Sequence, residues 1–261
     1  MHRILPLLSV PLLATGCAGE GTWVLETWGE SYIEASIPAG DFADGCEVVY
    51  DVFLVVDTRM ALLDGDGEAV AEVPEARVYD MTRTGPHAIA ALDVPATHYD
   101  TVRWRIAPAP DTVAGNATTD QVALVSDLAA SVYVAGTLAC GSDAVAFDWA
   151  FDTDTTYLCE PEDLTIPAGG EDGTQLTVHG DHLFYDGLEN ADAVVRGQAI
   201  LDADADQDGR VTLEELAAMS VATLGYDVGS RSEVSDLGAF VAFLSRTLGH
   251  IDGEGHCQVD L

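Results

Sequence analysis

The stretch Val48-Val49-Tyr50-Asp51-Val52-Phe53-Leu54-Val55-Val56 indicates the fold class of this chain. It is a short, mostly apolar run rich in β-branched and aromatic side chains, and such a run is typical of a β-strand. Similar alternating or wholly apolar runs occupy residues 101–106, 131–138 and 144–151. Turn-forming residues separate the runs at 64–67, 84–86 and 141–143. The chain up to Cys159 is therefore predicted to consist mainly of strands.

No segment before Cys159 has a convincing helical spacing of apolar residues, so an antiparallel β-sandwich is the expected arrangement. The character then changes, because residues 161–173 are acidic and contain two prolines and a Gly-Gly pair. We expect a signal peptide at 1–16, a β-sandwich domain at 17–159, a linker with a last strand at 160–178, and a helical domain at 179–261.

The helical domain is predicted from the spacing of apolar residues after the last strand. The clearest amphipathic segment comes last, and Ser235 is a suitable N-cap for it. Three helices are expected to pack together as a C-terminal unit. Their apolar positions are Val194, Val195 and Leu201, then Leu213, Leu216 and Met219, and finally Leu237, Phe240, Val241, Leu244 and Leu248.

The charge of the chain restricts its partners. With 48% hydrophobic residues the chain can form a folded core despite a formal net charge of −35. Its 45 acidic residues face only 10 basic ones, all of them Arg. Nucleic acid is therefore excluded as a partner, because phosphates would be repelled rather than neutralised. Divalent cations are suitable partners, although most of the carboxylates are expected only to keep the surface hydrated.

The N-terminus has the features of a bacterial export signal. Arg3 provides a positive start, and residues 4–13 form a short apolar stretch. The sequence Leu13-Ala14-Thr15-Gly16-Cys17 then resembles the lipobox of bacterial lipoproteins, in which small residues precede a Cys that is lipidated. Ala14 stands where that motif prefers Leu. The alternative is a plain secretory signal in front of an unrelated Cys.

The lipobox resemblance implies an outer-membrane lipoprotein. Ala18 does not provide the acidic residue that retains some lipoproteins in the inner membrane. No other apolar run is long enough to span a bilayer, so the lipid on Cys17 would hold the protein to the membrane. Whether it faces the periplasm or the cell surface is left open, and an envelope protein is a candidate partner.

Four cysteines remain when Cys17 carries a lipid, and an even number in an oxidising compartment predicts two disulfides. Of the three connectivities, we favour Cys46–Cys140 and Cys159–Cys257, the first of which lies within the expected β-sandwich domain. A thiolate metal site is the competing use of these residues. None of the four belongs to a C-x-x-C pair, which argues against that use.

Residues 204–215 match the calcium-binding loop of the EF-hand family position by position, with the pattern D-x-D-x-D-G and an acidic twelfth residue. Ca²⁺ prefers six to eight oxygen ligands, and Gly at the sixth position permits the sharp turn around the ion. The resemblance implies carboxylate ligands from Asp204, Asp206 and Asp208, the carbonyl of Arg210, Thr212 directly or through water, and both oxygens of Glu215. The alternative is an acidic loop that holds no ion.

EF-hands usually occur in pairs, but no second loop of this pattern exists in the sequence. Residues 225–235 lie where a partner loop could sit, and we interpret them as an ion-free structural partner at most. Val211 is the apolar residue that would pack against such a partner. An unpaired site in a calcium-rich compartment is expected to be a permanently filled structural brace rather than a sensor.

Two short histidine motifs flank the helical region. They are His179-Gly180-Asp181-His182 and His250-Ile251-Asp252-Gly253-Glu254-Gly255-His256. Antiparallel packing could bring them together, and imidazoles with a carboxylate would then suit Zn²⁺ or Cu²⁺. The candidate ligands are His179, His182, His250, Glu254 and His256. The alternative is that these histidines are ordinary helix-end and surface residues.

The sequence identifies no catalytic residue, since the chain has no nucleophile elbow, P-loop, zinc-protease or dinucleotide motif, and no Lys. The segments H-G-D-H-L-F-Y-D at 179–186 and R-T-L-G-H at 246–250 resemble acidic lipoproteins of myxobacteria-like organisms, a likeness that implies no activity. We therefore expect a lipid-anchored calcium-binding protein with a structural or binding role. The alternatives are a transition-metal binder using the histidines and a metal-dependent hydrolase built on the same residues.

Overall fold

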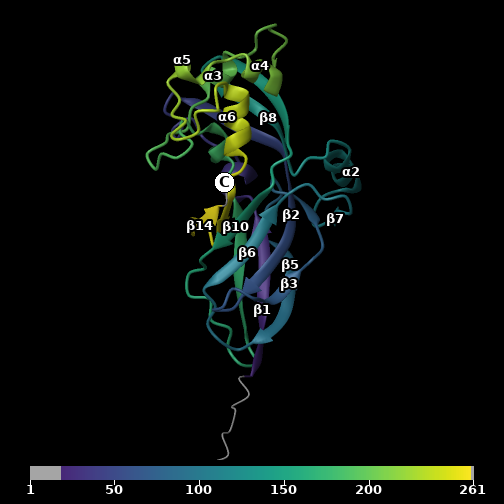
Figure 1. Ribbon diagram of the computed structural model, residues 1–261. Helices are drawn as coiled ribbons and strands as arrows, with labels where there is room; N and C mark the ends of the chain where they lie inside the picture. Colours follow the sequence, from purple (N-terminus) through teal and green to yellow (C-terminus); the bar gives the residue numbers. More distant parts are fainter. Residues whose placement is uncertain (1–18, 260–261) are drawn as a thin grey trace, which may run out of the picture.

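The computed structural model describes residues 19–259 and is organised around two β-sheets (Figure 1). The smaller sheet has the strand order β13-β11-β1-β5. The larger sheet has the order β12-β9-β8-β2-β6-β10-β14, with β3 and β4 also paired to β2, and β7 paired to β4. The bounds in the small sheet are Glu20–Trp28 (β1), His87–Pro95 (β5), Glu171–Val178 (β11) and Gly249–Ile251 (β13). In the large sheet they are Cys46–Leu63 (β2), Ala69–Val73 (β3), Arg77–Asp80 (β4), Thr101–Ile106 (β6), Val113–Ala114 (β7), Val132–Cys140 (β8), Asp143–Phe151 (β9), Thr155–Cys159 (β10), Arg210–Val211 (β12) and Cys257–Val259 (β14).

The predicted strands are confirmed, and the fold is mainly β. Residues 48–56 lie within β2, residues 101–106 coincide with β6, and the other two runs fall almost entirely within β8 and β9. The neighbouring pairs β6·β2, β2·β8 and β8·β9 are all antiparallel. The turn at 64–67 closes the β2–β3 hairpin, where Asp64 N–H donates to the carbonyl of Glu68 at 2.9 Å.

The two sheets share one hydrophobic core. Trp23 of β1 and Leu176 of β11 belong to the same buried cluster as Trp104 of β6 and Tyr157 of β10. The rings of Trp104 and Tyr157 stack with centroids 4.9 Å apart. A Cβ at Gly249 would lie 2.6 Å from the Trp104 ring, so only glycine lets β13 approach the large sheet this closely. Burial of these large side chains is the main source of stability here.

Three strand pairs depart from the antiparallel expectation. β4 pairs with β7 and β12 with β9 in parallel, and β1 pairs with β11 in parallel within the small sheet. These strands are far apart in sequence, and a parallel pair needs a long crossover between its strands. The small sheet therefore takes strands from both sides of residue 160, where we expected a domain boundary. The division into two domains remains a prediction.

Helix α2 (Thr119–Asp127) was not expected from the sequence. Thr118 and Gln121 form a capping box, in which each side chain bonds to the backbone of the other residue. Val125 of α2 is buried against Leu54 and Val56 of β2 in a second, smaller apolar cluster. The T-x-x-Q spacing of the capping box was the sequence feature that could have indicated this helix. The helix was missed because the apolar face that follows is short.

The predicted C-terminal unit of three helices is wrong in form. Between residues 198 and 259 the structure contains four short helices, α3 (Gln198–Leu201), α4 (Leu213–Ala217), α5 (Val221–Leu224) and α6 (Leu237–Leu244). Val195 lies in extended chain and forms bridges with Phe42 and Tyr185. The N-cap of α6 is Asp236, not Ser235, since Asp236 accepts from the N–H of Ala239 at 2.8 Å. The apolar residues of this region belong to the core that is shared with the large sheet. Their regular spacing therefore reflects burial against that sheet and not the packing of three helices on one another.

Two further short helical elements lie outside the sheets. Helix α1 spans Glu30–Glu34, and a 3₁₀ helix, η1, spans Asp181–Phe184. Within residues 19–259, no helix is both long enough and apolar enough to cross a membrane. The signal peptide and Cys17 lie outside the described residues.

Both disulfides join the cysteines that the sequence analysis paired. Cys46 of β2 lies opposite Cys140 of β8, and Cys159 of β10 lies opposite Cys257 of β14. Each bridge therefore links two neighbouring strands of the large sheet. The bridges close loops with sequence separations of 94 and 98 residues, which restricts the unfolded chain strongly.

Asp57 of β2 is a buried carboxyl without a partner. Its side chain has no solvent exposure, and neither oxygen has a hydrogen-bond partner among residues 19–259. Burial raises the pKa of Asp57 well above its ordinary value. Folding therefore favours the protonated acid. This contribution to stability is full below the unfolded pKa of about 3.9 and is lost as the pH rises through the folded pKa.

Asp57→Asn is expected to raise the free energy of unfolding at pH 7 by on the order of 1–3 kcal/mol, and by less at pH 5. Urea unfolding at the two pH values measures this difference. Asp80 of β4 is the matched control, because it is also buried but accepts hydrogen bonds from Thr82 and Gln121. Asp80→Asn is expected to destabilise the protein. Equal effects of Asp57→Asn at both pH values would contradict the assignment.

Candidate metal sites

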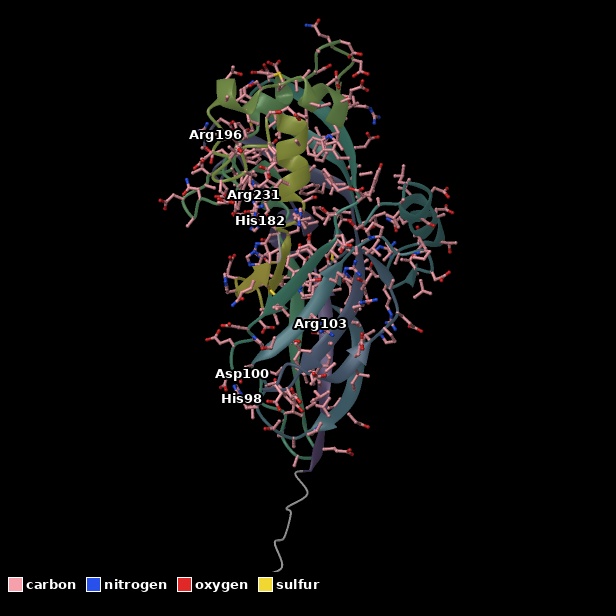
Figure 2. All side chains as sticks on the ribbon, in the orientation of Figure 1. His98, Asp100, Arg103, His182, Arg196 and Arg231 are labelled. Atoms are coloured by element: carbon pink, nitrogen blue, oxygen red, sulfur yellow. A yellow bond between two sulfur atoms is a disulfide. The ribbon has the colours of Figure 1, made fainter. Side chains whose placement is uncertain are left out.

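Three histidines from the two sequence motifs meet in the structure. One ring nitrogen from each of His179, His182 and His250 lies within 4.8 Å of the others. The ring centroids are 4.2 Å apart for His179 and His250, and 5.0 Å apart for His182 and His250. Figure 2 shows His182 just below α6, near the middle of the molecule in this view. The arrangement gathers three imidazoles around one small volume.

The pairing of β11 with β13 brings the two motifs together. Thr177 of β11 lies opposite His250 of β13, and His179 follows β11 directly, with its N–H donating to the carbonyl of Leu248 at 2.9 Å. Gly180 then turns the chain into η1, which carries His182. A Cβ at Gly180 would lie 2.8 Å from the ring of Tyr50, whose hydroxyl donates to the Gly180 carbonyl at 2.6 Å. The core therefore fixes where this turn lies.

The hydrogen bond of His182 defines which of its nitrogens is free. The hydroxyl of Thr247 donates to the carbonyl of Leu244 at 2.9 Å, so its oxygen accepts from Nδ1 of His182 at 3.1 Å. This tautomer, inferred from the partners, leaves a lone pair on Nε2 of His182. Metal-binding histidines are commonly oriented in this way by a partner on the other ring nitrogen.

The other two histidines also keep one nitrogen free. Nε2 of His179 faces the carbonyl of Gly253 at 3.3 Å and Oε1 of Glu30 at 3.5 Å. Both partners accept hydrogen bonds, so Nε2 carries the proton, and Nδ1 has no hydrogen-bond partner within the described part of the chain. Nδ1 of His250 is buried and has no hydrogen-bond partner among residues 19–259. A buried nitrogen without a partner costs stability unless something else binds it.

The protonation of the cluster suits metal binding. Burial, followed by the charges of His250 and His179, lowers the pKa of His182 to about 3. Burial, followed by the charge of His179, lowers the pKa of His250 to about 4. The pKa of His179 is raised, because the hydrogen bond and charge of Glu30 outweigh the effect of burial. Two of the three imidazoles are thus neutral at pH 7, the form that binds metal ions.

Carboxylates border the cluster on the side of His179. Glu30, His179 and Glu254 form a second group whose ligand atoms lie within 4.8 Å of one another. Asp181 is 6% exposed and accepts from the hydroxyl of Tyr185 at 2.9 Å through Oδ2, while its Oδ1 has no partner among the described residues. Burial raises the pKa of Asp181. The two groups share His179, but no group of the described residues combines the three histidines with a carboxylate.

The expected ligand set is only partly assembled. His179, His182 and His250 share one group, and Glu254 joins His179 in the second. His256 is exposed and belongs to neither group, although its carbonyl accepts from the N–H of Glu160 at 3.1 Å. Glu30 was missed by the sequence analysis. It lies on α1, about 150 positions before His179, and no motif distinguishes it from the other acidic residues.

The acidic loop at 204–215 brings some of its expected ligands together. Carboxylate oxygens of Asp204, Asp206 and Glu215 lie within 4.8 Å of one another. Gly209 has a φ of 83°, as the sharp turn requires, and its N–H donates to Oδ2 of Asp204 at 3.0 Å. Asp208 is not in this group and instead accepts from the N–H of Arg210 at 2.8 Å.

The end of the loop is held by helix α4. Thr212 and Glu215 form a capping box at the start of the helix, and the Thr212 hydroxyl donates to Oε2 of Glu215 at 2.9 Å. Hydrogen bonds from the backbone N–H and the side-chain hydroxyl of Thr212 lower the pKa of Glu215. The side chain of Arg210 points away from the loop and pairs with Asp148 of β9. A guanidinium is cationic and has no acceptor atom, so only the backbone carbonyl of Arg210 could act as a ligand.

The loop docks on the large sheet instead of on a partner loop. Val211, in β12, pairs in parallel with Phe147 of β9 and is fully buried. Nε1 of Trp149 donates to the carbonyl of Val211 at 2.9 Å. The expectation that residues 225–235 are the structural partner is therefore wrong. A sheet edge supplies the hydrogen bonds that a second EF-hand loop would otherwise provide.

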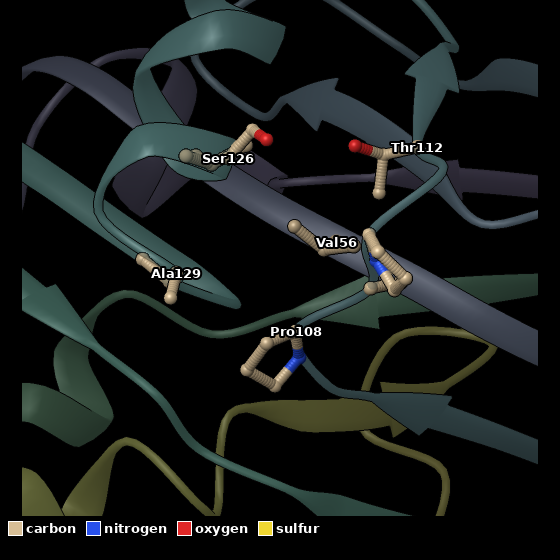
Figure 3. Close-up of a pocket in the computed structure, with 9 residues that line it drawn as sticks. Val56, Pro108, Thr112, Ser126 and Ala129 are labelled. Atoms are coloured by element: carbon tan, nitrogen blue, oxygen red, sulfur yellow. The ribbon is translucent and has the colours of Figure 1, made fainter.

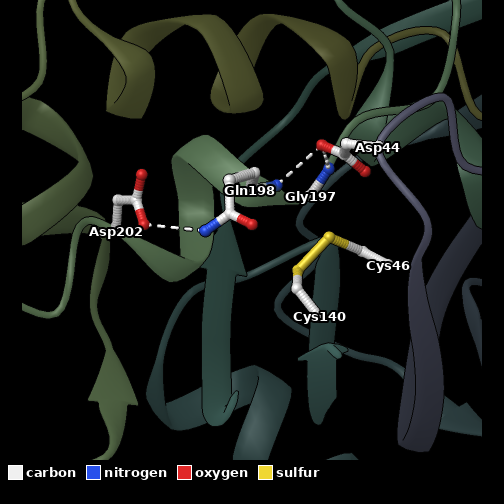
Figure 4. Close-up of a disulfide and its surroundings, with 6 residues drawn as sticks. All are labelled: Asp44, Cys46, Cys140, Gly197, Gln198 and Asp202. Carbon is white, nitrogen blue, oxygen red and sulfur yellow. Dashed lines mark hydrogen bonds between the residues drawn. A yellow bond between two sulfur atoms is a disulfide. The ribbon is translucent and has the colours of Figure 1, made fainter. Parts of the chain in front are cut away.

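Helix α3, in front of the loop, is anchored beside a disulfide (Figure 4). Oδ2 of Asp44 accepts from the N–H groups of Gly197 at 2.9 Å and Gln198 at 2.8 Å, and so caps the helix from a distant part of the chain. A Cβ at Gly197 would lie 2.8 Å from Cβ of Cys46. Both ends of the acidic loop are thus fixed to the large sheet.

A hollow of about 380 Å³ lies between α2 and β2, as Figure 3 shows. Its walls are mostly apolar and include Val56, Pro108 and Val125, with hydroxyl groups only from Thr112 and Ser126. It contains no titratable side chain. The hollow therefore offers no metal-binding or acid–base chemistry.

Comparison with known proteins gives one weak structural similarity. No protein-family model matches the chain, and no curated protein matches it. Among solved structures, the chain is similar to MbnP from Methylosinus trichosporium, with 8% sequence identity and a TM-score of 0.39. The likeness covers 93% of this chain and 99% of that one. A similarity of this degree carries no argument about function.

Proposed function

We propose that this chain is a metal-binding protein of the bacterial cell envelope, with a Zn²⁺ or Cu²⁺ site at His179, His182 and His250. The observation that supports this best is the gathering of three imidazoles, of which His250 has a buried Nδ1 without a partner. Residues from two distant segments converge on one point, and neutral imidazole is the preferred ligand of both ions.

Glu30 and Glu254 are candidates for a further ligand. Zinc sites in proteins usually have four ligands, with three from protein side chains where one position stays open. Both carboxylates are grouped with His179, one of the three histidines, so a modest movement of either side chain would be needed to reach the ion. His256 is left out of this proposal, because its side chain is exposed and lies outside both groups.

Metal analysis of the protein purified without chelators tests the proposal. About one equivalent of zinc or copper per chain, removed by a chelator and restored by adding the ion, is the expected result. Calcium as the sole metal, with no tight binding of added Zn²⁺ or Cu²⁺, would contradict it. Hydrolysis of an ester by the metal-loaded protein would add a catalytic role to the binding role.

The second part of the proposal is that residues 204–215 hold a structural Ca²⁺. Support comes from the gathered oxygens of Asp204, Asp206 and Glu215 and from the match to the EF-hand pattern. The ion would brace the junction between α3, β12 and α4. Because this loop is docked on a sheet rather than on a partner loop, we propose a constitutive site rather than a sensor.

Glu215→Gln is expected to weaken Ca²⁺ binding and to remove most of the rise in melting temperature that Ca²⁺ produces. At a Ca²⁺ concentration 100 times the dissociation constant, binding stabilises the folded state by about 2.7 kcal/mol, so its loss is measurable by thermal unfolding. Glu214→Gln is the matched control, since the neighbouring Glu214 is in no ligand group. Identical melting of the wild-type protein with Ca²⁺ and with chelator would refute the structural role.

The location in the envelope rests on the sequence of the N-terminus and on the disulfides. Disulfides form in exported proteins, and the lipobox resemblance at Cys17 supports lipid attachment at the outer membrane. We propose an envelope protein as the partner and no nucleic acid, given the net charge of −35. Mass spectrometry of the mature N-terminus is the direct test, with a diacylated or triacylated Cys17 as the expected result.

A further inference from the structure

The arginines of this acidic chain are unevenly distributed and unevenly paired. Six of the nine arginines at residues 19–259 form an ion pair with Asp or Glu within 4.0 Å (ten in the chain, less Arg3). Within that part of the chain, Arg59, Arg103 and Arg246 have no such pair. Carboxylates outnumber arginines by 45 to 10, so an unpaired guanidinium is unusual here.

Two of these three arginines line one groove on the large sheet. The groove has a volume of about 600 Å³ and is lined by Arg59, Glu72, Arg103, Arg105, Asp154 and Thr156. Figure 2 shows Arg103 in the middle of the sheet, well away from His182. Arg103 and Arg105 stand two residues apart on β6 and therefore point to the same face. Trp104 between them points into the core.

A β-bulge directs Arg59 to that same face. Thr58 pairs with Arg105 and Ala61 pairs with Arg103, so two residues of β2 oppose the single Trp104 of β6. Arg59 in this bulge has a φ of 49°, an unfavourable backbone conformation for a residue with a side chain. The bulge leaves Arg59 exposed while Met60 is buried. Strain of this kind is often found where a side chain is positioned for binding.

The acidic residues of the groove do not neutralise it. Arg105 holds Asp154 with two hydrogen bonds, at 2.6 Å and 2.5 Å. The hydrogen bonding from Arg105, together with the charges of Arg105, Arg246 and Arg59, lowers the pKa of Asp154. Glu72 lies in the lining but forms no ion pair with any described arginine. Arg59 and Arg103 therefore keep donors free for a ligand.

We propose that this groove binds a small ligand bearing a multiply charged oxyanion, such as a phosphate group or two carboxylates. Guanidinium groups bind both with paired N–H donors, and the groove volume suits a small molecule. An acidic protein would face repulsion from the whole surface of charge −35. A small anion would feel mainly the local arginines, because repulsion beyond about 8 Å is screened at physiological ionic strength.

Calorimetric titration with inorganic phosphate and with succinate, in chelator-free buffer at low salt, tests the proposal. At least one probe is expected to bind with 1:1 stoichiometry and with an affinity that falls as salt is added. The phosphate and succinate titrations distinguish a tetrahedral oxyanion from a dicarboxylate. The double variant Arg59→Gln/Arg103→Gln is expected to bind about tenfold or more weakly.

Two further variants separate binding from folding. Arg103→Lys keeps the charge but loses the planar fork, and is expected to bind more weakly than wild type and more tightly than Arg103→Gln. Arg196→Gln, which removes a paired arginine in the upper part of Figure 2, should leave binding unchanged. Failure of both probes to bind at millimolar concentration would overturn the proposal. So would undiminished binding by folded Arg103→Gln, or binding of poly-glutamate but of neither probe.

Discussion

Replacing His182 with alanine is expected to weaken the binding of Zn²⁺ or Cu²⁺ by about 100-fold or more. The substitution removes one of three imidazoles, and loss of even an outer partner of a ligand typically lowers metal affinity by roughly 10- to 100-fold. His182 is neutral in the folded protein, so its removal leaves no uncompensated charge. The rise in melting temperature on adding metal should shrink in parallel with affinity. Competition titration against a chelating dye measures the affinity directly.

Two companion variants make this result specific. Thr247→Val removes the oxygen that accepts from Nδ1 of His182 and keeps the side-chain volume, so it is expected to reduce affinity by roughly 10-fold or more. His98→Asn is the matched control, because His98 is exposed and bonds to Thr165 and Asp100 far below the cluster in Figure 2. A metal affinity of His182→Ala equal to that of His98→Asn would rule out the three-histidine site.

The strands could be predicted from sequence because each one is a short apolar run between turn residues. Residues 101–106 match β6 from end to end, since burial on one face imposes alternation over the whole strand. The disulfides could also be predicted, because only three connectivities exist for four cysteines. The parallel pairing of β1 with β11 could not be predicted, because register between distant strands depends on packing that local spacing does not encode.

The residues of the candidate sites could likewise be predicted only in part. The two histidine motifs were recognisable because their residues are rare and closely spaced, whereas Glu30 is one acidic residue among 45. The EF-hand pattern identified Asp204, Asp206 and Glu215 but gave no hint that Val211 would pair with β9. The arginine groove had no sequence motif at all. It depends on a bulge at Arg59 and on neighbouring strands that are distant in sequence.

Removing the disulfide between Cys159 and Cys257 by a double substitution to serine is expected to destabilise the protein by about 2–5 kcal/mol. The bridge closes a separation of 98 residues, so its loss releases much conformational entropy to the unfolded chain. It also holds β14 against β10, directly after the segment that carries His250 and Glu254. Metal affinity at the histidines should therefore fall as well. Denaturant unfolding and metal titration measure the two effects separately.

The disulfide between Cys46 and Cys140 provides a matched comparison within the same sheet. Its separation of 94 residues is nearly equal, so its removal should cost about the same stability. It lies beside Gly197 and α3, however, so the expected loss is in Ca²⁺ binding at the acidic loop and not in metal binding at the histidines. If both double variants lowered Zn²⁺ or Cu²⁺ affinity equally, general loosening of the fold would explain the effect. If one variant lost affinity only at the histidines and the other only at the acidic loop, each bridge would be shown to support the site nearest to it.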